Sequence, residues 1–148
     1  MPRIRVSTTI AAPPDRVWDE LRHIDRHVLW MADAEAIRFT SRRREGRGTT
    51  FECDTRIGPF HLVDRMEITQ WRTNRAMGVR HSGLVTGEGR FTLKPVRRRS
   101  GTATRFTWNE RLRFPWWMGG PVGGAVGAPV MKRLWRHNLT RLRHRIEH

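Results

Sequence analysis

Between residues 34 and 114 the chain consists almost entirely of short strand-like runs joined by tight turns. The runs lie near 34–43, 48–57, 60–71, 75–82, 86–97 and 102–114, and their connections are short and rich in Gly, Pro or Arg. Such a meander builds an antiparallel sheet with one apolar face, and that face needs a cover. The one element long and apolar enough to cover it is a C-terminal helix, in which apolar residues recur at helical spacing from Val130 to Ile146.

The N-terminal part adds one strand and two short helices. Residues 3–11 alternate between apolar and polar and predict a strand. Pro14 suits the first position of a helix, and a second short helix is predicted from Asp25 to Met31. Residues 119–129 are all small or cyclic, and Pro129 either starts the long helix or kinks an earlier turn. The order predicts one α+β domain over residues 1–148, a curved seven-stranded antiparallel sheet wrapped around the long helix.

The turn signals also predict which strand residues face each other. The turn at 58–59 places residue 53 opposite 64, the turn at 72–73 places 64 opposite 81, and the tip at 99–100 places 89 opposite 110. The remaining link, 81 across from about 89, closes on the loop at 83–87. These registers align five residues side by side across the apolar face of the sheet: Cys53, Asp64, His81, Gly89 and Glu110.

The same face carries large apolar residues, so the polar row lies in an apolar hollow. A slip of one residue in any hairpin would send these side chains to opposite faces, which argues for the predicted alternation. Candidate ligand contacts on or near this face are Trp30, Phe51, Cys53, Met66, Val79, Phe91, Trp108 and Trp117. Large aromatics such as Trp30 and Trp108 are more often core residues, and a small buried hydrophobe is the favoured interpretation of Cys53.

Three residues of the row are candidates for acid–base chemistry. A histidine beside a carboxylate serves as a general base, so we expect His81 to act as the base and Asp64 to orient it. An apolar wall favours the protonated form of Glu110, which makes it a candidate acid. The alternative is structural: a hydrogen-bonded Asp64–His81 pair that only braces the strands, with Glu110 paired to an Arg of the long helix. The three also resemble a metal-ligand set, but no short-spaced ligand pair supports one, so we expect no metal.

Composition limits the remaining classes. The net charge is +15, yet 27 of the 29 basic residues are Arg, spread along the chain, and no nucleic-acid-binding motif is present. We therefore expect solvated basic faces and no specific nucleic-acid partner. No apolar stretch approaches the ~20 residues of a membrane span. The charged start and the lone Cys53 favour a cytoplasmic protein without disulfides, as a monomer or homodimer.

Several segments together resemble one protein family. An opening strand runs into residues 12–21 (APPDRVWDEL), Trp30-Met31 precedes the second strand, Gly48-Thr49 opens the third, and the chain ends on a long helix after Phe114-Pro115. In these features the chain is similar to the START/polyketide-cyclase-like superfamily, often labelled SRPBCC, which has the helix-grip fold of the birch-pollen allergen. The similarity covers essentially the whole chain.

The resemblance implies an internal cavity between sheet and helix, no cofactor, and a small hydrophobic or aromatic ligand of lipid or polyketide type. The alternative it leaves open is a cyclase, dehydratase or hydrolytic enzyme that uses the Asp64, His81 and Glu110 row. The aromatase/cyclase branch uses a pocket Arg and aromatic hydroxyls, whereas this chain has no Tyr, and alternation points its strand arginines outward. No catalytic residue carries over from that branch.

Overall fold

The computed structural model describes residues 3–116 and 120–148, with only the backbone described for residues 120–126. In chain order the elements are β1 (Arg3–Ile10), α1 (Pro14–Leu21), η1 (Ile24–Leu29), β2 (Ala34–Phe39), β3 (Thr50–Ile57), β4 (Phe60–Arg72), β5 (Ala76–Ser82), β6 (Thr86–Arg98), β7 (Gly101–Arg113) and α2 (Gly120–Glu147). The predicted order of elements is confirmed.

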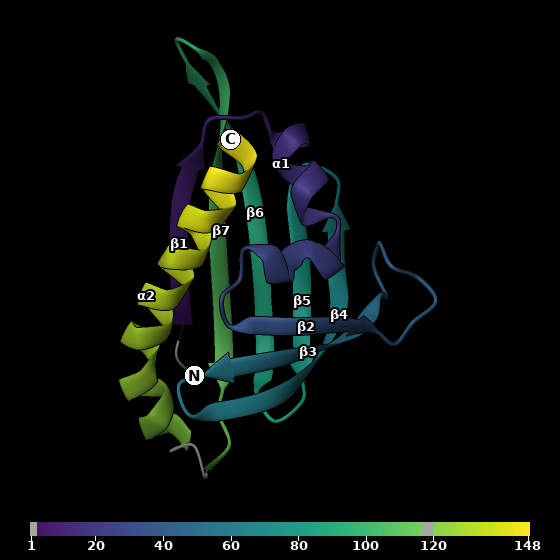
Figure 1. The fold of residues 1–148 in the computed structure, drawn as a ribbon, viewed down its shortest axis with the longest axis vertical. Coiled ribbons are helices and arrows are strands. Elements are labelled where there is room, and N and C mark those ends of the chain that lie inside the picture. The colour runs from purple at the N-terminus through teal and green to yellow at the C-terminus, as the bar shows by residue number, and fades with distance from the viewer. Residues whose placement is uncertain (1–2, 117–119) are drawn as a thin grey trace.

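The seven strands form one antiparallel sheet that curls around its own apolar face. Their order is β1-β7-β6-β5-β4-β3-β2, so each strand from β2 to β7 lies beside its neighbour in sequence and β1 closes on β7. The sheet bends strongly, and β2 and β3 cross in front of the upright strands β5 to β7 (Figure 1). The curvature leaves a hollow between the two ends of the sheet.

The long helix lies along one side of this hollow, packed mainly against β1 (Figure 1). It begins at Gly120 and continues through Pro129, so the small-residue segment from 120 is helical and not a loop. Gly and Ala fit a helix that passes close to other backbone, and an internal Pro costs one hydrogen bond without ending the helix. The predicted second short helix is present as a 3-10 helix, η1, which starts at Ile24.

Two predicted strand registers are confirmed and two are wrong by two residues. Cys53 faces Asp64, and Glu110 faces Gly89, as expected. His81, however, faces Met66 and Gly87. The shift against β4 arises in the β4–β5 connection, which is a three-residue loop containing Asn74 at a φ of 65°. The shift against β6 arises in the β5–β6 turn, where Ser82 pairs with Thr86. A bulge between Ile68 and Gln70 recovers one residue of the three, and the even net shift keeps every side chain on its predicted face.

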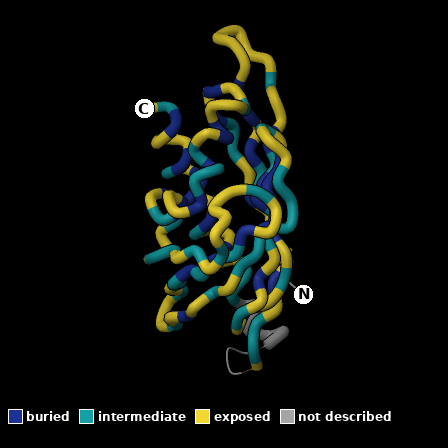
Figure 2. Tube along the Cα trace, turned by 90° about the vertical axis from the view of Figure 1, so that its right-hand side faces the viewer, coloured by how far each residue is buried: buried dark blue, intermediate teal, exposed yellow. Residues whose placement is uncertain are grey.

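The core occupies the concave face and the inner surface of α2. Figure 2 shows buried residues along the inside of the molecule and an exposed β6–β7 hairpin tip projecting beyond it. Trp30, Phe106, Leu139 and Leu142 are among the fully buried side chains. The strand arginines at 56, 65, 80, 105, 111 and 113 are all exposed, as the alternation predicts. Within the described residues, no helix has an apolar stretch long enough to cross a membrane.

Candidate functional site

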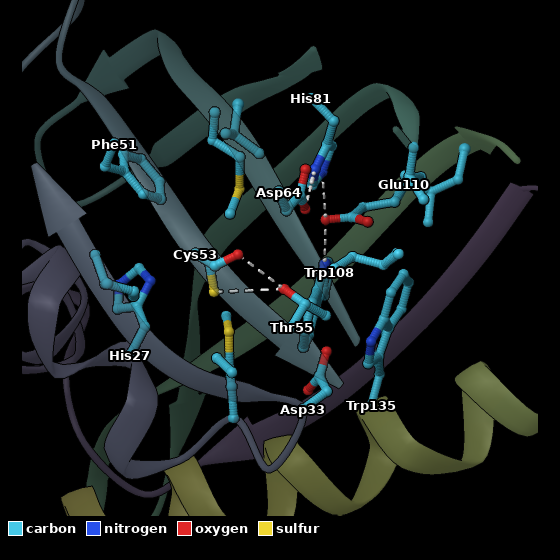
Figure 3. Close-up of a pocket in the computed structure, with 18 of the residues that line it drawn as sticks. His27, Asp33, Phe51, Cys53, Thr55, Asp64, His81, Trp108, Glu110 and Trp135 are labelled. Carbon is cyan, nitrogen blue, oxygen red and sulfur yellow. Dashed lines mark hydrogen bonds and ion pairs between the residues drawn. The ribbon is translucent and has the colours of Figure 1, made fainter. Parts of the chain in front are cut away.

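A cavity of about 100 Å³ remains inside the curled sheet, closed on one side by α2 (Figure 3). Its wall is largely apolar and includes side chains from β2 to β7 and from α2. The polar residues among its lining come from different elements, and they are His27, Asp33, Cys53, Thr55, Asp64, His81, Arg90 and Glu110. The cavity is therefore a largely apolar chamber with a few polar groups at fixed positions, which is typical of a small-molecule binding site.

Asp64, His81 and Glu110 form one hydrogen-bonded triad in the cavity wall (Figure 3). Nδ1 of His81 lies 2.8 Å from Oδ2 of Asp64, and Nε2 lies 3.4 Å from Oε1 of Glu110. The contacts are diagonal, because the ladder partner of His81 on β4 is Met66 and not Asp64. Diagonal neighbours lie within reach of side chains of this length. The carboxylate of Glu110 also accepts the indole N–H of Trp108 at 3.1 Å.

The triad holds His81 as a cation. Burial alone would lower its pKa, but the charge of Glu110 and the hydrogen bonds to Asp64 and Glu110 outweigh burial and raise the pKa to about 10. At neutral pH both ring nitrogens therefore carry protons, and each donates to a carboxylate oxygen. A general base needs a free lone pair, and the protonated ring of His81 in this triad has none.

Gly89 makes room for this arrangement. A Cβ at position 89 would lie 2.6 Å from both Cγ and Oε1 of Glu110, which is closer than real Cβ atoms approach. The side chain of Glu110 thus crosses β6 over Gly89, which has no side chain, and reaches His81 on β5. The side chain of Glu110 fills the space beside Gly89. The partner of Glu110 is His81 and not an Arg of the long helix.

Replacing Gly89 with Ala should push Glu110 away from His81. We expect the free energy of unfolding to fall by about 1–3 kcal/mol, typical of overpacking, and the pKa of His81 to fall because its strongest stabilising charge moves off. Urea denaturation and an NMR titration of the imidazole measure the two effects. Gly127→Ala is the matched control, since a Cβ there meets open space on a helix. An unchanged pKa of His81 in Gly89→Ala would contradict the claim that Gly89 allows Glu110 to reach His81.

A second acidic group reaches the cavity from the opposite side. Asp33 precedes β2, and its Oδ1 accepts a 2.8 Å hydrogen bond from Nδ2 of Asn138 on α2. Oδ1 of Asn138 in turn accepts the backbone N–H of Ala32 at 2.9 Å. Burial, together with the negative charge of Glu110, raises the pKa of Asp33. The sequence analysis missed this pair, although a fully buried Asn between Trp135 and Leu139 breaks the apolar face of the helix and signals a special position.

His27 was also missed, and it is held as a neutral ring. Burial lowers its pKa to about 4. One ring nitrogen, Nε2, lies 2.8 Å from the carbonyl oxygen of Leu21, and because a carbonyl only accepts, Nε2 carries the proton. This leaves the lone pair of Nδ1 without a hydrogen-bond partner among the described residues. The ring lies at the cavity wall below Phe51 (Figure 3).

Six of the eight predicted ligand contacts line the cavity: Phe51, Cys53, Met66, Val79, Phe91 and Trp108. Trp30 does not reach it, because it is fully buried behind Phe91 and Trp108 and packs edge-on against Trp108. Trp117 lies outside the described residues. Burial raises the pKa of Cys53 to about 11, so its thiol stays protonated and unreactive. No three His, Cys, Asp or Glu side chains of the described chain are arranged to hold a metal ion.

The comparisons with known proteins agree on one family. A family model described as polyketide cyclase/dehydrase and lipid transport matches residues 1–147. The chain belongs to this family. No curated protein matches it. The family description covers both enzymes and carriers, so membership leaves the ligand and any reaction undetermined.

Several solved structures of low sequence identity share the fold across nearly their whole length. A START superfamily protein from Mycobacterium smegmatis superposes with a TM-score of 0.75 at 15% identity, covering 98% of this chain and 97% of that one. A conserved protein from Geobacillus kaustophilus gives 0.76 at 15% identity, with 98% and 95% covered. The Zhui aromatase/cyclase from Streptomyces sp. R1128 gives 0.70 at 16% identity, with 99% and 93% covered. These likenesses support the helix-grip fold.

Proposed function

We propose that this member of the polyketide cyclase/dehydrase and lipid transport family binds a small hydrophobic or aromatic molecule in its internal cavity. The observation that carries the proposal is the cavity itself, a largely apolar chamber of about 100 Å³ bordered by residues of the hydrophobic core. Empty apolar space weakens packing, and a structure keeps it at a cost in stability unless a ligand fills it. Trp108 and Trp135 stack at 4.5 Å beside the chamber and offer an aromatic surface for such a ligand.

Acid–base catalysis by the triad is the second candidate function. It is favoured by one observation, that Asp64, His81 and Glu110 all line the same cavity. The pKa of His81 is raised to about 10, so the ring is protonated at neutral pH. We propose that this imidazolium donates a proton to a bound carbonyl or hydroxyl group. Proton donation by His81 would leave the neutral ring between two carboxylates, so the triad returns to its resting state by taking a proton back.

Filling the cavity should abolish binding without unfolding the protein. Val79 lines the chamber, and Val79→Phe is expected to lower the affinity for a neutral probe, benzyl alcohol, by more than about tenfold, because the ring takes the space the probe needs. Isothermal titration calorimetry measures the affinity. Native mass spectrometry of freshly purified protein tests whether Val79→Phe also loses any compound that co-purifies with the unsubstituted chain.

The matched control is Arg80→Phe, which places the same ring on the exposed outer face of β5, one residue away. It should bind benzyl alcohol as the unsubstituted chain does. Equal affinity of all three proteins, or no binding by any of them together with no co-purifying compound, would rule out the proposed cavity function.

A further inference from the structure

The wall of the cavity presents more hydrogen-bond acceptors than donors. Oδ1 of Asp64 is buried and has no hydrogen-bond partner among the described residues. One buried donor of the wall, Nε1 of Trp135, also lacks a partner there. Both hydrogen bonds to Glu110, whose side chain is only 7% exposed, converge on Oε1, so its Oε2 accepts none from the described residues. Nδ1 of neutral His27 is a third free acceptor. Buried acceptors without partners are costly, and a bound molecule that carries donors would satisfy them.

The net charge of the cavity wall favours the same kind of ligand, one that carries hydrogen-bond donors. Three carboxyl groups, Asp33, Asp64 and Glu110, line the chamber, while His81 is the one buried cation there among the described residues. Arg90 touches the rim but is exposed. The wall is therefore negative whether or not Asp33 is ionised. The negative charge of Glu110 helps to raise the pKa of Asp33, so the two carboxyl groups interact electrostatically across the chamber.

From these two observations we propose that the ligand is an apolar or aromatic molecule that carries a protonated amine. The inference rests on the proposed function and adds the ligand's chemical class. The ammonium group would lie between Asp33 on one side and the Asp64–Glu110 side of the triad on the other, and its N–H groups would donate to the free oxygens. The apolar body would lie against the aliphatic wall and the stacked rings of Trp108 and Trp135, which also favour a nearby cation.

The basic surface of the protein does not contradict this assignment. A net charge of +15 repels a cation at long range, which slows its entry at low salt but is screened beyond roughly 10 Å at physiological ionic strength. Affinity is decided by the buried wall, where charges interact in a low dielectric. The surface charge instead predicts that a carboxylate ligand would be steered toward the protein and then rejected by the wall.

Three probes with the same ring separate charge from shape: benzylamine, benzyl alcohol and benzoate. Calorimetry at pH 7 and about 0.15 M salt is expected to give benzylamine at least tenfold higher affinity than benzyl alcohol, with benzoate weakest. Equal affinity of the amine and the alcohol, or tightest binding of benzoate, would overturn the inference while leaving the cavity function standing. Failure of all three probes to bind would remove the cavity function and the inference with it.

Two variants test whether the preference for benzylamine comes from the carboxyl groups of the cavity wall. Asp33→Asn keeps the size of the side chain, and it should reduce the preference for benzylamine over benzyl alcohol about tenfold. Glu110→Gln should do the same from the other side of the chamber. The control is Glu88→Gln, which changes the net charge equally on the exposed outer face of β6. A preference that falls equally in the control would overturn the inference, because it would then reflect total charge.

Discussion

Replacing His81 with Gln is expected to lower the free energy of unfolding by about 3–5 kcal/mol, a large part of the ~5–15 kcal/mol that a domain of this size has. The reason is the triad geometry. Asp64 and Glu110 are 15% and 7% exposed, and His81 is the cation that each of them contacts. Without it, two carboxylates would face each other in an apolar wall with no compensating charge. Urea denaturation at pH 7 measures the loss.

Removing both acids as well should restore most of that stability. The triple variant with His81→Gln, Asp64→Asn and Glu110→Gln replaces a charged network with neutral groups of similar shape, and such replacements are often close to neutral. His61→Gln is the control, because His61 also contacts a carboxylate, that of Glu35, but on the exposed surface. We expect it to change stability by less than about 0.5 kcal/mol.

The same comparison separates a bracing triad from a catalytic one. A loss in His81→Gln that the triple variant recovers would show that the triad stabilises the folded sheet. A single variant that stays fully stable would contradict the buried ion network and would favour an open, hydrated site in which the row is free to react. The two readings of the polar row that the sequence leaves open are therefore decided by one set of denaturation curves.

The face of each residue in the polar row was predictable, whereas the exact partners of His81 were not. Alternation depends only on whether a shift is odd or even, so the loop at Thr73–Arg75 and the bulge after Ile68 moved His81 by two residues without moving it off the concave face. Loop length and bulges depend on tertiary packing that the local sequence does not encode. The prediction of Asp64 opposite His81 was wrong for that reason, and the contact between their side chains survived because histidine and carboxylates reach diagonally.

The candidate site was predictable where it lies on strands and not where it lies on loops and helices. Gly89 beside Glu110 is a strand feature, and the turn signals located it. Asp33 and His27 lie in or next to short irregular segments, where no periodicity indicates which way a side chain points. Asn138 carried a readable signal, a polar residue on the buried stripe of an amphipathic helix.

The ion network also makes stability depend on pH in a defined direction. The pKa of His81 is raised from its ordinary 6.5 to about 10 in the folded protein. A group with a raised pKa binds its proton more tightly when the protein is folded, so its contribution is fully present below pH 6.5 and is lost as the pH rises from 6.5 toward 10. For one proton the slope approaches about 1.4 kcal/mol per pH unit.

His27 acts in the opposite direction and in a different window. Its pKa is lowered by burial to about 4, so the folded protein disfavours its protonation and loses stability as the pH falls from 6.5 toward 4. The two histidines together predict a maximum of stability near pH 6.5, flanked by an acid limb and an alkaline limb with separate causes.

Denaturation curves at pH 6.5, 7.5, 8.5 and 9.5 test the alkaline limb. The background there is low, since the chain has no Tyr and only two Lys. The pKa of Cys53 is raised to about 11 in the folded protein, so its thiol lowers stability above about pH 9, but it does so equally in both proteins. The unsubstituted protein should lose stability steadily over this range, and the triple variant should lose much less, because its three neutral side chains do not titrate there. If the free energy of unfolding depends on pH in the same way in the two proteins, then His81 titrates near its ordinary pKa. That result would contradict the charged triad.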